Sequence, residues 1–166
     1  MSSFYRKFSK FIKTPDSPDS RAIVFIDSRI NRWEDLVQQA VPEVRVIVLG
    51  LMDDGISAIT QILNTSFCRE VYFVCLGSPG CLYLGGSELS WNTLIQYESK
   101  LQSWFWHLDF QAASSQPSCS KLYLSGSNVA MGDVGAEFLT KLNLMTGAAI
   151  AASTDVYSSK VFDSTQ

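Results

Sequence analysis

The chain has 166 residues, 46% of them hydrophobic and 17% charged, and its formal net charge at pH 7 is −3. This length can bury one hydrophobic core, and the lack of any uninterrupted run of about 18 apolar residues excludes a transmembrane helix. Nucleic-acid binding depends on clustered lysines and arginines, so an acidic chain disfavours it. The first residues also lack the apolar stretch and cleavage site of a secretory signal, so we expect a cytoplasmic protein, with peripheral membrane contact as an open alternative.

The N-terminal segment, residues 1–13, places apolar and basic side chains at helical spacing and contains no acid. We expect a short basic amphipathic helix that docks in a partner's groove or on an anionic membrane surface. The residues expected to make this contact are Phe4, Arg6, Lys7, Phe8, Lys10, Phe11, Ile12 and Lys13. The alternative is that the segment folds back on the domain or is disordered. Residues 14–20, with two prolines among turn formers, predict a linker to a single α/β domain over residues 21–166.

Strand and helix patterns alternate from residue 22 onward. Apolar runs predict buried strands over residues 22–26, 44–49, 71–76, 122–124 and 148–152. A further short strand is predicted at residues 81–86, where it interrupts the alternation of strands and helices. Helical patterns predict helices through 33–40, after Asp54, after Ser90 and from Gly132, where Asp54 and Ser90 act as N-caps and Gly147 as a C-cap. Continuous apolar strands that alternate with helices predict a Rossmann-like α/β fold, a three-layer α/β/α sandwich with a mostly parallel central sheet.

Cysteine and histidine usage gives no sign of a metal site. The four cysteines share no CxxC spacing: Cys68, Cys75, Cys81 and Cys119. His107 is the only histidine. Asp27 and Asp155 end strands at one expected edge of the sheet, which leaves metal binding as an alternative, but solvated caps are the commoner use of acids there. We therefore expect no metal and no cofactor.

Several blocks of this sequence occur together in one known family. They are Val24-Phe25-Ile26-Asp27-Ser28-Arg29, Gly77-Ser78-Pro79-Gly80 with Leu82 and Leu84-Gly85, Gly126 with Asn128-Val129-Ala130, and Thr146-Gly147-Ala148 with Ala151-Ala152-Ser153-Thr154-Asp155. In the content and order of these blocks the chain resembles the bacterial domain of unknown function 4347, which is common in cyanobacteria. The resemblance covers roughly residues 22–155 and implies a caspase-like fold.

The same resemblance implies a catalytic pair that this chain lacks. In the family a histidine closes one strand and a cysteine closes its neighbour, at the carboxyl ends where open α/β sheets place their ligand crevice. The histidine lowers the pKa of the thiol or carries its proton, so both side chains are needed. Here Leu76 stands at the histidine position and Ser127 at the cysteine position. The remaining members of this vestigial crevice would be Asp27, Gly77, Gly126, Asn128 and Asp155.

These observations favour a non-catalytic pseudoenzyme that acts as a protein-interaction or assembly module. It would dock to a larger complex or a membrane surface through residues 1–13, without binding nucleic acid. One alternative is a residual cysteine or serine hydrolase or peptidase with Cys81 or Ser127 as nucleophile, although no base can be assigned to either. Backbone N–H groups of residues 126–128 could also form an anion pocket, or simply a strand-to-helix turn. A decayed fragment without a role is a third alternative.

Overall fold

The structure, a computed structural model, describes residues 9–13, 22–66, 68–106, 120–155 and 161–162. Within them, one sheet has six strands in the order β1-β3-β2-β4-β8-β9, and a second sheet has three strands in the order β5-β6-β7. The predicted linker at 14–20 and the first part of the predicted helix, residues 1–8, lie outside the described residues.

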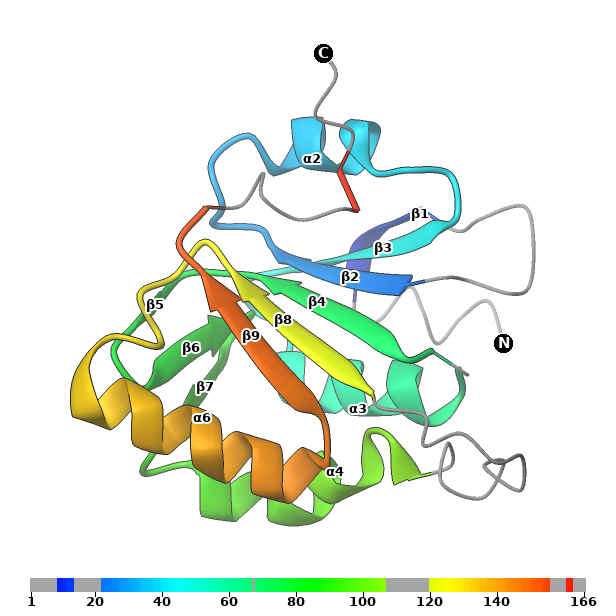
Figure 1. The fold of residues 1–166 in the computed structure, drawn as a ribbon. Coiled ribbons are helices and arrows are strands. Elements are labelled where there is room, and N and C mark those ends of the chain that lie inside the picture. The colour runs from blue at the N-terminus through cyan, green and yellow to red at the C-terminus, as the bar shows by residue number, and fades with distance from the viewer. Residues whose placement is uncertain (1–8, 14–21, 67, 107–119, 156–160, 163–166) are drawn as a thin grey trace.

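Five strands of the large sheet are parallel, as predicted. They are β3 (Val44–Leu49), β2 (Ala22–Asp27), β4 (Glu70–Val74), β8 (Lys121–Ser125) and β9 (Ala149–Ser153). The central strand β2 is buried at all six positions, which is why its sequence is continuously apolar rather than alternating. The carboxyl ends of all five strands meet at one edge of the sheet (Figure 1).

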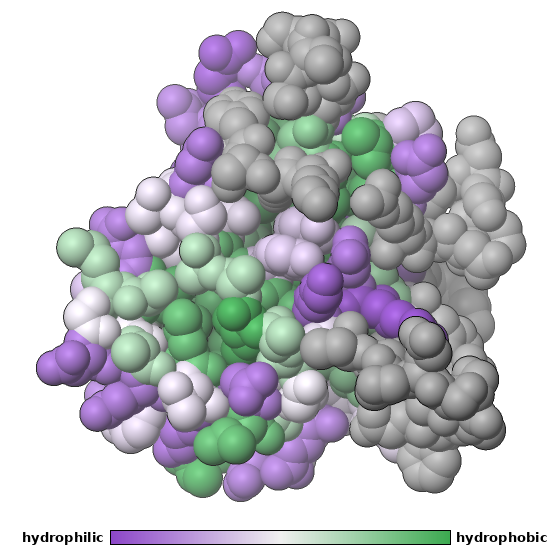
Figure 2. Space-filling view, in the orientation of Figure 1, coloured by the Kyte–Doolittle hydropathy of each residue, from purple (hydrophilic) through white to green (hydrophobic). Residues whose placement is uncertain are grey.

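Helices cover both faces of this sheet and make the three-layer α/β/α sandwich that the sequence predicted (Figure 1). On one face lies α2 (Trp33–Gln39), and on the other lie α3 (Gly55–Asn64), η1 (Leu94–Tyr97), α4 (Glu98–Ser103) and α6 (Gly132–Thr146). Two buried apolar clusters, one on each side of the sheet, form the core. Figure 2 shows apolar side chains gathered between α6 and the edge strand β9 on the face turned to the viewer.

Two of the predicted helix caps are present. The Asp54 side chain accepts a hydrogen bond from the Ser57 N–H at 3.1 Å and caps α3. Gly147 ends α6 with a φ of 71°, a left-handed conformation that favours glycine. The third expected cap, Ser90, is wrong, because Ser90 belongs to a strand and the helical segment starts later, with Thr93 at its N-terminus.

The smaller sheet occupies the place where the sequence predicted one short strand at 81–86. It contains β5 (Gly77–Ser78), β6 (Cys81–Leu84) and β7 (Ser87–Ser90), all antiparallel. Thr93 Oγ1 accepts the Ser90 N–H at 2.8 Å and donates to the Glu88 carbonyl at 2.8 Å, which fixes the turn after β7. Sequence reasoning missed β7 because its residues, Ser-Glu-Leu-Ser, carry little β propensity by themselves.

The prediction of a helix over residues 1–13 is wrong for Ser9–Lys13, which form the strand β1. This strand pairs antiparallel with β3, and Ser9 lies opposite Leu49. An isolated helix of this length is marginal in water, whereas pairing with the edge of β3 supplies partners for backbone groups of both strands. The α/β domain therefore includes β1 and does not begin at residue 21 as predicted.

Candidate functional site

Leu76 and Ser127, the two positions that the sequence singled out, lie at neighbouring strand ends. Strands β4 and β8 are parallel, with Val74 opposite Ser125. The Cys75 N–H donates to the Ser125 carbonyl at 3.2 Å, so the pairing continues past the ends of both strands. A Cβ atom added at Gly77 would lie 3.0 Å from Ser127 Cβ. The fold thus brings the two segments together at the carboxyl edge of the sheet.

The two side chains have opposite environments. Leu76 is 42% exposed, whereas Ser127 is 6% exposed. Ser127 Oγ is buried and has no hydrogen-bond partner among the described residues. An unpaired buried hydroxyl costs about 1–3 kcal/mol. A serine nucleophile needs a base within hydrogen-bond reach and access to its substrate, and in this conformation Ser127 Oγ has neither among the described residues.

Burial disfavours the thiolate form of the three described cysteines, of which Cys75 and Cys81 follow β4 at this edge and Cys68 precedes it. Burial raises the pKa of the Cys81 thiol, and hydrogen bonds from Tyr83 and Ser78 offset only part of that rise. Burial also raises the pKa of Cys75 far above its usual range and that of Cys68 to about 11. The remaining candidates, Cys119 and His107, lie outside the described residues.

Asp27 at the end of β2 is fully buried and is held by several donors. The Arg29 side chain donates to its carboxylate from Nε at 2.8 Å and from Nη2 at 2.7 Å, and the Gly85 N–H donates at 2.7 Å. Arg29 Nη2 also donates to the Gly85 carbonyl at 2.8 Å. The carboxylate thus ties the end of β2 to the turn between β6 and β7, and its contacts are structural rather than those of a vacant ligand site.

Of the other predicted crevice residues, Gly77 belongs to β5, whereas Gly126, Asn128 and Asp155 lie in the segments that follow β8 and β9. Gly126 has a φ of 83°, and its N–H donates to the Ser153 carbonyl at 3.0 Å, which removes that donor from the suggested anion pocket. The Asn128 carbonyl accepts the Met131 N–H at 3.0 Å before α6 begins. Asp155 is exposed beyond β9, and its backbone N–H donates to Ser153 Oγ at 3.1 Å. Among the described residues, no group of three or more metal-ligating side chains comes together.

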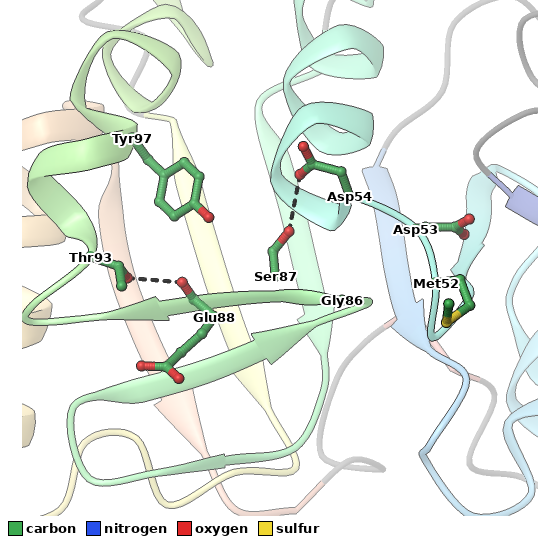
Figure 3. Close-up of a pocket in the computed structure, with 8 residues that line it drawn as sticks. All are labelled: Met52, Asp53, Asp54, Gly86, Ser87, Glu88, Thr93 and Tyr97. Carbon is green, nitrogen blue, oxygen red and sulfur yellow. Dashed lines mark hydrogen bonds between the residues drawn. The ribbon is translucent and has the colours of Figure 1, made fainter.

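Sequence reasoning missed a cavity of about 450 Å³ at the same edge, between the loop that follows β3 and strand β7. Figure 3 shows its lining, which consists of Met52, Asp53, Asp54, Gly86, Ser87, Glu88, Thr93 and Tyr97. The adjacent acids Asp53 and Asp54 before a helix were a visible signal. The contribution of β7 was not visible, because it depends on the Gly86 N–H donating to the Asp53 carbonyl at 2.7 Å across the two segments.

The Asp54 carboxylate in this cavity keeps its charge at neutral pH. Its partial burial raises its pKa, but hydrogen bonds from the Ser57 hydroxyl, the Ser57 N–H and the Ser87 hydroxyl, together with the charge of Lys100, outweigh that effect, so the pKa falls below its usual value. The hydroxyl bonds measure 2.7 Å from Ser57 and 3.0 Å from Ser87. The cavity is therefore lined by at least one fixed negative charge.

Large apolar side chains are exposed on the segments around the carboxyl edge. We call them the edge apolar surface: Leu76, Trp91, Met131 and Val134, which are 41–59% exposed. The turn at Gly80, between β5 and β6, lies close to two of these segments: the Trp91 N–H donates to the Gly80 carbonyl at 3.2 Å, and a Cβ added at Gly80 would lie 2.6 Å from the Val134 side-chain atom Cγ1. Large apolar side chains exposed on a protein surface mark candidate contact surfaces.

In the part of the chain that the structure describes, none of the helices combines the length and the apolar character that crossing a bilayer needs. A family model described as "Domain of unknown function (DUF4347)" matches residues 23–162. No curated protein matches the chain.

Proposed function

The chain belongs to the family of the domain of unknown function 4347, and on that premise we propose that it is a non-catalytic, caspase-like module that binds another protein, alone or within a larger assembly. The observation that carries this proposal is the exposure of Leu76 and the burial of Ser127 after the neighbouring strands β4 and β8. Leu76 presents an apolar side chain to solvent where a base would stand, and the hydroxyl of Ser127 is buried beside it.

The edge apolar surface supports a binding role for this part of the molecule. Its four side chains lie on the loop after β4, the turn after β7 and the start of α6. When a partner removes exposed apolar groups from water, the free energy falls by about 25 cal/mol for each Å² of apolar surface buried. Aromatic residues and methionine are also enriched at protein interfaces, and the surface contains Trp91 and Met131. A polypeptide partner with apolar side chains fits this surface best.

The surroundings of the thiols do not favour the alternative of a residual hydrolase. A cysteine nucleophile works as a thiolate, and the raised pKa of Cys81 opposes that form. Ser127 would have to leave its buried position before it could reach a substrate.

Site-specific photo-crosslinking in the native host tests the proposal. A benzophenone amino acid placed at Leu76 or Met131 should give a discrete crosslinked product, because both positions face the partner. The matched control is Leu144, which is 77% exposed on α6 but lies outside the edge apolar surface, and which should give none. Circular dichroism of each variant checks that the fold is kept.

Treatment of the same protein with serine- and cysteine-directed active-site probes distinguishes the binding module from the residual hydrolase. We expect no labelling of Ser127 or Cys81 in the native state. Stoichiometric labelling of either residue, abolished by its alanine variant, would establish a hydrolase and contradict the proposal. Equal crosslinking from positions 76, 131 and 144 would remove the edge apolar surface as the binding site.

A further inference from the structure

The loop that follows β3, residues 50–54, is exposed and combines apolar and acidic side chains. Leu51 is 55% exposed and Met52 is 94% exposed, the highest value among the exposed large apolar residues described. Asp53 and Asp54 follow directly. Met52 and both acids line the 450 Å³ cavity (Figure 3). Exposure of large apolar side chains to water is unfavourable, so the loop is a candidate contact surface.

The register of β1 places its amino end, Ser9, close to this loop. Because β1 runs antiparallel to β3 and Ser9 lies opposite Leu49, the amino end of β1 lies beside the end of β3 from which the loop starts. The Gly50 N–H donates to Asp53 Oδ2 at 2.6 Å. The Asp53 carboxylate is therefore held at the end of β3 that faces the amino end of β1.

The segment 1–8 and the loop are complementary in charge and in apolar content. The segment has the sequence Met-Ser-Ser-Phe-Tyr-Arg-Lys-Phe, with two cations, three aromatic rings and no acid. The loop has two carboxylates, two large exposed apolar side chains and no base. Lysine and arginine stems can cover apolar surface while their charged ends reach carboxylates.

We propose that residues 1–8 dock on the 50–54 loop, with Lys7 and Arg6 at the carboxylates of Asp53 and Asp54 and the aromatic side chains on Leu51 and Met52. The inference goes beyond the proposed function, because it does not depend on whether the domain is catalytic. Arg6 is three residues from Ser9, a span of about 10 Å for an extended chain, which leaves both cations within reach of the loop.

Covalent continuity favours this occupant over a partner in solution. A segment joined by a short tether to the neighbourhood of its site is present at an effective concentration in the millimolar range. Ion pairs at exposed sites contribute only about 0–1 kcal/mol each, so a free basic peptide would bind weakly. The tethered segment loses less translational and rotational entropy on docking than a free peptide does. An external ligand of this cavity would have to displace residues 1–8.

Oxidation of methionine by hydrogen peroxide tests the docking in the full chain. By exposure alone Met52, at 94%, should oxidise faster than Met131, at 59%. With residues 1–8 docked, Met52 is covered and should oxidise more slowly than Met131.

The double variant Arg6→Glu, Lys7→Glu removes the charge complementarity, and Met52 should then oxidise severalfold faster while the rate of Met131 is unchanged. Lys121→Glu, a charge reversal at an exposed position of β8, is the matched control and should leave both rates as in the original chain.

A zero-length carbodiimide crosslink identifies the contact and its partner. In a mixture of ¹⁵N-labelled and unlabelled chains, Lys7 should be joined to Asp53 or Asp54 within one chain, and Lys7→Arg should abolish the product because a guanidinium does not couple. Crosslinks only between labelled and unlabelled chains would assign the loop to a second copy and overturn the proposal. Faster oxidation of Met52 than of Met131 in the original chain would overturn it as well.

Discussion

At the scale of single residues, a buried charge at the end of β2 holds two distant parts of the chain together. Asp27 is fully buried, and Arg29, whose side chain is 30% exposed, is its partner at 2.7 Å. The same carboxylate accepts the N–H of Gly85, 58 residues away. Removing one partner of a buried ion pair is costly, because the other partner loses its compensation.

We expect Asp27→Ala to lower the free energy of unfolding by about 3 kcal/mol, the range for breaking a buried ion pair. The control is Asp155→Ala, which removes an exposed acid at the same edge and should change stability by less than about 0.5 kcal/mol. Urea denaturation followed by circular dichroism measures both. Equal effects of the two substitutions would mean that Asp27 does not hold the β6–β7 turn.

At the scale of elements, the start of α3 connects the helix to the β6–β7 hairpin. Asp54 caps α3 through Ser57 and also accepts the Ser87 hydroxyl at 3.0 Å. A Cβ atom at Gly55 would collide with the Leu84 carbonyl oxygen, so only glycine lets the first turn of α3 approach β6 this closely. The contacts between the start of α3 and the β6–β7 hairpin therefore hold Asp54 and Ser87 in place in the lining of the cavity.

Asp54→Ala should destabilise the protein by about 1 kcal/mol at pH 7, the usual cost of losing an N-cap. Because the folded state lowers the pKa of Asp54, the charged form contributes stability above the ordinary aspartate pKa of about 4, and that contribution is lost as the pH falls through the lower folded value. The difference between the two proteins in urea titrations should therefore shrink below about pH 4.

Glu137→Ala provides the control for this pH dependence. Glu137 is exposed within α6, and its removal should change the free energy of unfolding by less than about 0.5 kcal/mol. A difference between Asp54→Ala and the original chain that stays constant from neutral to acidic pH would contradict a charged cap.

At the scale of the whole molecule, strand β1 (Ser9–Lys13) forms one edge of the large sheet. Strand β1 is the antiparallel neighbour of β3, whose residues Ile47 and Leu49 are fully buried. A docking helix separated from the domain by a linker would be dispensable for stability, whereas an edge strand is not.

Deletion of residues 1–13 should lower the free energy of unfolding by at least about 2 kcal/mol, since each lost backbone hydrogen bond costs about 1 kcal/mol. Deletion of residues 1–8 keeps β1 and should have a much smaller effect. Chemical denaturation and size-exclusion chromatography measure stability and any association through the freed edge of β3. If both deletions left the stability unchanged, β1 would not be an integral strand.

Local patterns in the sequence were sufficient for the layers of the fold. Strand β3 follows the predicted run over residues 44–49 without a shift, and Asp54 and Gly147 cap their helices as expected. These features depend on burial of both faces of a strand and on hydrogen bonds within one turn of helix, which neighbouring residues decide. The block order also placed Leu76 and Ser127 at adjacent strand ends.

Contacts between residues far apart in the sequence decided the rest. The basic apolar pattern of residues 9–13 fits a helix, but the free edge of β3 makes it a strand. Ser127 lies against the segment around Gly77, 50 residues earlier, and the Gly86 N–H, which donates to the Asp53 carbonyl, joins the two sides of the cavity. A single sequence records which side chains are available, whereas only the tertiary structure determines which backbone edges stay open and which polar groups lose contact with water.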